Sequence, residues 1–284
     1  MVKIPTSDLG FIQQKLHDIT QELQETYDDT IDNNIDNNID NDIDNTVDNN
    51  ISNTIEDIDD TLIATNASNT RHPNILVKAL EQLLHQLQFI QRKDHEILKN
   101  NQTNVLETQD HNTLANYGIK LFADLTHIAK TLQISSIHDE LRRLGFGFGL
   151  WVAQNDIEIT LLAPLVDNIA FVFSELSQPS DFVQLYTATS QIMEATSFTQ
   201  QENNKRNPAC WERLVLNRTK IAIQTHQQPL IEQAFEAIIE LLPEQAADFF
   251  QECTTRMEMA QYPTTTKTII EKYCLLYCKP HTLH

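Results

Sequence analysis

Two cysteines and two histidines gather near the end of the sequence: Cys274, Cys278, His281 and His284. The cysteines are four residues apart, so a helix would place them on one face, and Pro280 separates them from the histidines. Thiolate and imidazole are ligands that zinc prefers, although this spacing matches no common zinc finger. We interpret the group either as a zinc site or as a helix end that carries two small buried thiols.

An aromatic and a cationic side chain offer a site of a different kind. Asn217 and Arg218 follow Trp211 by about two helical turns. Tryptophan and arginine are enriched where protein contacts are strongest, so we predict that Trp211, Asn217 and Arg218 bind a segment of a protein partner. The alternative is that Arg218 pairs with acidic side chains of its own chain, which carries 40 Asp and Glu against 20 Lys and Arg.

The sequence contains none of the common catalytic motifs. No nucleophile elbow, phosphate-binding Walker sequence, dinucleotide fingerprint or HExxH is present. We therefore expect a non-catalytic protein, with no catalytic residues and no cofactor. An enzyme with unrecognised chemistry is the alternative, because active sites are assembled in space from residues that are distant in sequence.

The net charge of −20 excludes several classes of partner. Twelve of the acidic residues lie between Asp28 and Asp60, where there is no Lys or Arg. An acidic chain without a basic tract is a poor ligand for nucleic acid or for an anionic membrane surface. We find no signal peptide, no apolar run of transmembrane length and four scattered cysteines. These features predict a cytoplasmic protein with free thiols.

The elements that must position these residues are predicted to pack around one apolar segment, Leu141–Ala153. Apolar residues recur there every three or four positions, so we expect a buried central helix over residues 137–154. Three of the five glycines lie within it, and each costs roughly 1 kcal/mol relative to alanine in a helix. We expect a neighbouring helix to approach closely across Gly145 and Gly149. Room for a ligand is the alternative.

The N-terminal region is predicted to have two parts. Apolar residues spaced by three and four predict an amphipathic helix within residues 1–27, with Ser7 as its cap. Residues 28–72 contain a tetrapeptide repeat, IDNN and its variants, which runs from Ile31 to Ile58. In a helix, a period of four turns the apolar stripe by about 40° per repeat, and Asn and Asp are poor helix formers. We predict a disordered acidic linker; a helical extension of the first segment is the alternative.

Two further regions are predicted to be helical throughout. In residues 73–133, a heptad pattern of leucines and then a second apolar run predict an antiparallel hairpin, through which the chain could form a homo-oligomer. Residues 134–284 are predicted to be a body of several hairpins. Six prolines there lie near the starts of amphipathic runs: Pro164, Pro179, Pro208, Pro229, Pro243 and Pro263. The predicted fold class is all-α, with helical hairpins packed around the buried central helix.

Within that body, the segment Trp211–Pro243 resembles a helical hairpin of the tetratricopeptide family. The resemblance depends on the spacing of Trp211 and Leu214 in the first helix, and of Phe235, Ile238 and Pro243 in the second. It implies a helical scaffold that binds a partner segment. The helical body also resembles conserved bacterial proteins of unassigned function, which implies no particular activity.

Overall fold

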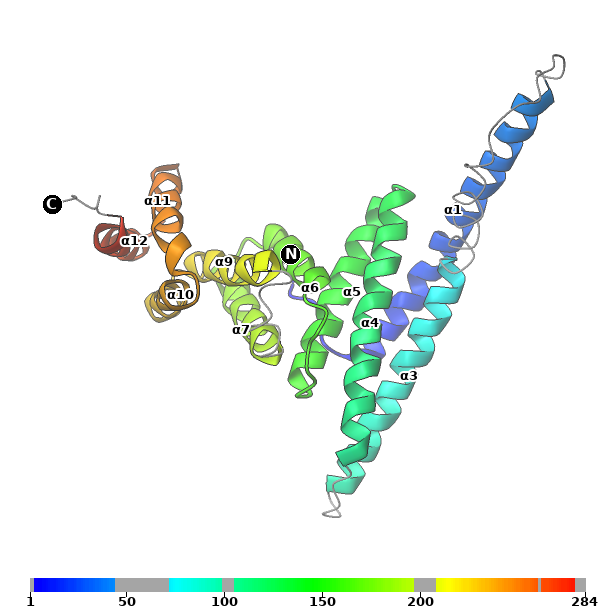
Figure 1. Cartoon of the computed structure of the whole chain (residues 1–284), viewed down its shortest axis with the longest axis horizontal. Coiled ribbons are helices and arrows are strands. Elements are labelled where there is room, and N and C mark those ends of the chain that lie inside the picture. Colours follow the sequence, from blue (N-terminus) through cyan, green and yellow to red (C-terminus); the bar gives the residue numbers. More distant parts are fainter. Residues whose placement is uncertain (1–2, 44–71, 99–104, 197–207, 260–261, 279–284) are drawn as a thin grey trace, which may run out of the picture. The chain divides into compact units, whose positions relative to one another are not determined.

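The computed structural model describes residues 3–43, 72–98, 105–196, 208–259 and 262–278. In this part of the chain the secondary structure consists of ten α-helices and one isolated bridge between Ile159 and Thr196 (Figure 1). None of the described helices is long and apolar enough to span a membrane. The prediction of an all-α fold is confirmed.

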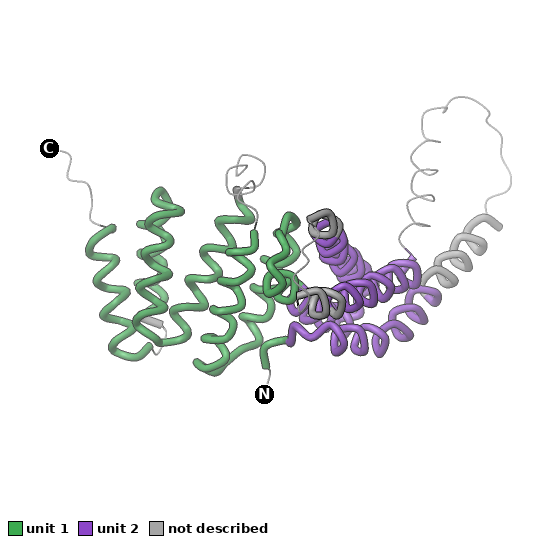
Figure 2. The backbone as a smooth tube through the Cα atoms, turned by 90° about the horizontal axis from the view of Figure 1, so that it is seen from below, with its two compact units in different colours: residues 1–5, 149–284 green, residues 6–148 purple. Residues whose placement is uncertain are grey.

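The chain divides into two compact units, and the division falls within one helix (Figure 2). Unit 2, residues 6–148, contains α1 (Leu9–Ile43), α3 (Pro73–Leu98), α4 (Val105–Thr131) and most of α5 (Ser135–Gln154). Unit 1, residues 1–5 and 149–284, contains the end of α5 and α6 (Ala163–Glu175), α7 (Pro179–Ala195), α9 (Pro208–Gln224), α10 (Gln228–Leu241), α11 (Pro243–Met259) and α12 (Thr264–Tyr277).

Helix α1 begins where an acidic side chain caps it. The Asp8 carboxylate accepts a hydrogen bond from the backbone N–H of Phe11, with an N···O distance of 2.7 Å, which satisfies one of the free donors of the first turn. The cap is therefore Asp8, and the predicted Ser7 cap is wrong by one residue. The predicted apolar stripe is buried in unit 2, where α1 packs against α3: Leu9, Ile12, Leu16 and Leu23.

The same helix is longer than predicted. It continues without a break past Tyr27 to Ile43 and so includes the first part of the acidic repeat. The amide of Gln24 donates to both carboxylate oxygens of Asp28 at 2.8 Å, and such a contact one turn apart supports the helix across the predicted boundary. The remainder of the predicted linker, residues 44–71, lies outside the described residues.

The heptad leucines of α3 form the core of unit 2. α3 packs against both α1 and α4, and it runs antiparallel to α4 as predicted (Figure 1). Its seam is buried at Leu76, Leu80, Leu83 and Leu87. Because α1 and α4 cover these leucines within the unit, a homo-oligomer would have to use other residues of the helices.

Helix α5 covers the segment that the sequence predicts to be a buried helix, and its second half is buried. Every residue from 144 to 152 is buried. In unit 2, Phe148 packs against Phe122 of α4 with a ring-centroid distance of 5.4 Å. A Cβ on Gly118 of α4 would lie only 2.6 Å from the Phe148 ring, so the glycine makes room for the phenylalanine.

Two glycines of α5 allow close approach of other parts of the chain. A Cβ on Gly149 would collide with the side chain of Leu165 in α6, within unit 1. A Cβ on Gly147 would collide with the backbone carbonyl of Thr6, within unit 2. The expected approach of a helix therefore occurs at Gly149, one of the predicted pair. A further close approach, of the segment that precedes α1, occurs at Gly147.

Each helix of unit 1 from α6 onward starts at or beside a proline, as predicted. Helices α7, α9 and α11 begin with Pro179, Pro208 and Pro243, respectively. The second residue of α6 is Pro164, and that of α10 is Pro229. Helix α12 follows directly after Pro263. A proline lacks an N–H that would be unsatisfied in the first turn anyway, so it starts a helix at little cost.

These helices pack in series (Figure 2). α9 contacts α6, α7 and α10, while α12 contacts α10 and α11. An aromatic cluster fills the interior between α10, α11 and α12. The ring centroids of Phe235 and Phe250 are 5.1 Å apart, and those of Phe235 and Tyr273 are 5.0 Å apart. These edge-to-face contacts add to the burial of large apolar surfaces and hold the end of the series together.

Candidate functional site

Two of the three residues predicted to bind a partner line one cavity of unit 1. Trp211 and Arg218 both belong to α9, and they are only 6% and 8% exposed. They lie in a cavity of about 410 Å³ whose other lining residues come from α7 and α10. The seven-residue spacing puts them on the same face of the helix, two turns apart. We call this space the Trp211 cavity.

Arg218 is held by polar and aromatic contacts from α7. Its Nε donates to the Ser190 hydroxyl at 2.8 Å, and its guanidinium carbon lies 4.4 Å from the centroid of the Tyr186 ring. Tyr186 in turn donates its hydroxyl hydrogen to the Gln233 side chain of α10 at 3.2 Å. Burial raises the pKa of the Tyr186 hydroxyl, and the adjacent Arg218 charge partly opposes this rise. The contacts join α7, α9 and α10 around the cavity.

The rim of the Trp211 cavity is acidic and apolar. Glu194 of α7 and Glu236 and Glu240 of α10 are exposed lining residues. Leu241, at the end of α10, is 40% exposed, and Met193 is half-buried. The lining therefore consists of a buried part, Trp211 and Arg218, which we call the floor, and a more exposed part, three carboxylates and two apolar side chains, which we call the rim.

The structure does not bring the third predicted residue into this cavity. Asn217 is half-buried on α9, and it is not among the residues that line the space. Sequence reasoning also missed the contributions of α7 and α10. The four-residue spacing of Glu236 and Glu240 predicts that the two carboxylates lie on one face of a helix. The sequence does not indicate that this face of α10 packs beside Trp211.

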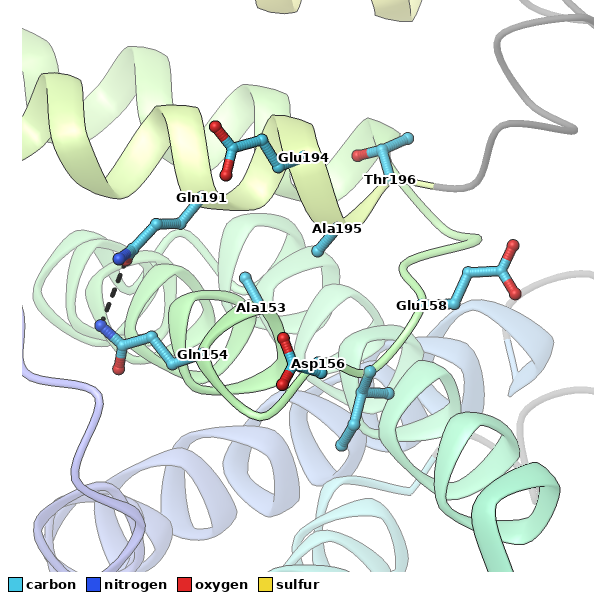
Figure 3. Close-up of a pocket in the computed structure, with 9 residues that line it drawn as sticks. Ala153, Gln154, Asp156, Glu158, Gln191, Glu194, Ala195 and Thr196 are labelled. Carbon is cyan, nitrogen blue, oxygen red and sulfur yellow. Dashed lines mark hydrogen bonds between the residues drawn. The ribbon is translucent and has the colours of Figure 1, made fainter. Parts of the chain in front are cut away.

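A second cavity of about 570 Å³ lies between the end of α5, the loop that follows it and the end of α7 (Figure 3). Its lining includes Asp156 and Glu158 of the loop and Glu194 of α7, so Glu194 lines both cavities. Gln154 and Gln191 face each other across it and are joined by a hydrogen bond of 3.3 Å. We call this space the Gln154 cavity.

The loop is attached to α7 by the backbone. The N–H of Ile159 donates to the carbonyl of Ala195 at 2.9 Å, beside the bridge to Thr196. Asp156 has a φ of 56°, which is a left-handed conformation that aspartate adopts more readily than most residues. The carboxylates of the Gln154 cavity are thus carried by a loop that is joined to the same helix end as Glu194.

The predicted zinc ligands are only partly described. Cys274 and Cys278 lie together at the end of α12, and the Cys278 thiol donates to the backbone carbonyl of Ala247 at 3.2 Å. Burial and the neighbouring Cys274 raise the pKa of the Cys278 thiol to about 11. His281 and His284 lie outside the described residues. Among the described residues, no group of three or more His, Cys, Asp or Glu side chains could hold a metal ion.

Comparison with known proteins gives no relative. No protein-family model matches the chain, and neither a curated protein nor a solved structure is similar to it. We therefore infer function from the geometry of unit 1.

Proposed function

We propose that this protein is a non-catalytic helical scaffold that binds a segment of a protein partner in the Trp211 cavity. The observation that carries the proposal is the cavity of about 410 Å³ with a buried tryptophan and a buried arginine in its floor. Tryptophan and arginine in a desolvated pocket are the residue types that contribute most to binding a protein partner.

The architecture around the cavity supports the same function. Hairpins packed in series are the arrangement with which helical-repeat proteins present a binding surface, and the resemblance of Trp211–Pro243 to a tetratricopeptide hairpin implies such a scaffold. The polar contacts of Arg218 with α7 hold it in place before a partner arrives. A pre-organised site loses less conformational entropy on binding.

The proposed setting is the cytoplasm. All four cysteines are free, and the pKa of Cys253 is raised to about 12, chiefly by burial. Thiols that stay protonated and unpaired are compatible with a reducing compartment.

The test is a selection of randomised peptides displayed on phage against the immobilised full chain. Affinities of recovered peptides are then measured for wild type, Ala237→Phe and Gln228→Phe. Ala237 of α10 lines the Trp211 cavity and is half-buried, whereas Gln228 is exposed on the same helix and lies outside the lining. We expect the phenylalanine at position 237 to fill the cavity and to weaken binding by about tenfold or more, while Gln228→Phe leaves it unchanged.

Two results would count against the proposal. One is that no peptide is recovered from the library on the wild-type protein. The other is that Ala237→Phe and Gln228→Phe bind the recovered peptides equally well while both retain the thermal unfolding midpoint of the wild type.

A further inference from the structure

Charge is distributed very unevenly around the two cavities of unit 1. Their lining residues include five carboxylates, namely Asp156, Glu158, Glu194, Glu236 and Glu240. Arg218 is the one Lys or Arg side chain among these same lining residues. Both cavities touch the last two turns of α7, and Glu194 belongs to both linings, so the two acidic spaces are adjacent along one helix end.

We infer that the partner segment is basic, with lysine or arginine side chains that flank an apolar side chain. This inference rests on the proposed function and specifies the chemistry of the partner. The segment would place its apolar side chain in the Trp211 cavity and its cationic side chains against the carboxylates of the rim and of the Gln154 cavity.

The carboxylates are placed to attract cations from a partner. Glu194, Glu236 and Glu240 are exposed, so they keep their hydration and form the rim of the site. Exposed charges of one sign steer an oppositely charged partner toward a site and reject partners of like charge. An acidic segment would meet three carboxylates before it reached the single guanidinium of Arg218.

Arg218 is compatible with a basic segment because of where it lies. It is 8% exposed in the floor, with Ser190 on its Nε and the Tyr186 ring beneath its guanidinium group. A guanidinium group has five N–H donors. A backbone carbonyl of an incoming segment can accept from them and carries no net charge, so it can lie near the surrounding carboxylates, whereas an anionic acceptor would be repelled. Arg218 therefore binds the backbone of the segment, and the glutamates bind its side chains.

The apolar side chain of the segment has a matching surface. Trp211 forms part of the floor, and Leu241 and Met193 line the same cavity. Leu241 is 40% exposed, which is a large exposure for a leucine in a helix that otherwise packs well. An apolar anchor surrounded by charged contacts is the usual arrangement of a specific protein contact.

The test uses the randomised peptide library on the full chain and compares three proteins. The first is wild type. The second carries Glu194→Gln, Glu236→Gln and Glu240→Gln, which removes the rim charges. The third is a matched control with Glu244→Gln, Asp248→Asn and Glu271→Gln, which removes three exposed charges of α11 and α12 that line neither cavity.

We expect peptides recovered on wild type to be enriched in Lys and Arg beside an aromatic or aliphatic residue. Their affinity should fall by about tenfold in the rim variant, because three exposed ion pairs are lost. It should change by less than about twofold in the control variant. Raising the salt concentration should weaken binding to wild type more than binding to the rim variant, since salt screens exposed charges.

The inference fails separately from the proposed function. If wild type recovers peptides that bind in the cavity but are neutral or acidic, or if the rim variant binds basic peptides as tightly as wild type, the basic partner is ruled out and the scaffold function stands. If wild type recovers no peptide of any composition, the scaffold function itself is overturned, and this inference is overturned with it.

Discussion

Trp211 and Arg218 lie two turns apart on one face of α9, and both are buried in the floor of the same cavity. Arg218 is fixed there by the Ser190 hydroxyl and the Tyr186 ring of α7. The relationship makes Arg218 a structural link between two helices as well as a candidate binding residue, so its replacement should affect stability in addition to binding.

The first prediction concerns the free energy of unfolding of an Arg218→Met variant. Loss of the hydrogen bond to Ser190 and of the contact with the Tyr186 ring should lower it by about 1–3 kcal/mol. Arg213→Met on the same helix is the control, because Arg213 is exposed and pairs with Asp167 at the surface. It should change the free energy by less than about 0.5 kcal/mol. Urea denaturation gives both values; equal losses in the two variants would refute the structural role of Arg218.

The second prediction concerns the close approach of Gly147 to the Thr6 carbonyl in unit 2. Gly147→Ala would place a Cβ against the Thr6 carbonyl, and relief of that clash requires the backbone to move. We expect a loss of about 1–3 kcal/mol in the free energy of unfolding. In the comparison variant Gly10→Ala, the nearest atom is the Asp8 side-chain oxygen at 3.1 Å, which can shift without movement of the backbone. Because alanine also favours the helix by up to about 1 kcal/mol relative to glycine, we expect no loss of stability in this variant. A Gly147→Ala protein as stable as wild type would contradict the packing around α5.

How far the sequence predicts this fold differs from one element to another. Local signals succeed: the six prolines mark helix starts, and the spacing of Leu76, Leu80, Leu83 and Leu87 predicts the seam of α3. Long-range contacts are missed. The glycine-rich segment indicates that something approaches α5 closely, but only the folded chain shows that Gly147 meets Thr6, because the two are distant in sequence.

The candidate site shows the same limit. Trp211 and Arg218 could be assigned to one face because helical periodicity is local. The adjacent Asn217 falls outside the cavity lining, since a neighbour in sequence points about 100° away on a helix. The acidic rim depends on how α7 and α10 pack on α9, and periodicity within a single helix carries no information about that packing.

The third prediction uses the raised pKa of Cys253. Burial raises it from 9.0 to about 12 in the folded chain, so the folded state retains a proton that the unfolded state releases. The contribution of the protonated Cys253 thiol to the free energy of unfolding is fully present below pH 9 and is lost as the pH rises from 9 toward 12. The free energy of unfolding of wild type should therefore fall more steeply over that range than that of Cys253→Ala. Parallel pH profiles of the two proteins would show that the thiol is not protected by burial.

The fourth prediction concerns metal content. A structural zinc site needs four protein ligands, and among the described residues no group of three or more His, Cys, Asp or Glu side chains could hold a metal ion. We therefore expect purified protein to contain no stoichiometric zinc by elemental analysis. A double variant with Cys274→Ser and Cys278→Ser is the control and should have the same metal content. One zinc per wild-type chain that disappears in the double variant would establish a metal centre at the end of α12.

The central claim, that the Trp211 cavity receives a segment of a partner, is tested most directly by the indole N–H signals in an NMR spectrum of the full chain. The chain has two tryptophans, Trp151 of α5 and Trp211 of α9, and a Trp151→Phe variant assigns the two signals. Titration with a basic peptide recovered from the library should shift the Trp211 signal in proportion to saturation and leave the Trp151 signal in place. A peptide that binds with an unchanged Trp211 signal would place its site elsewhere and contradict the account.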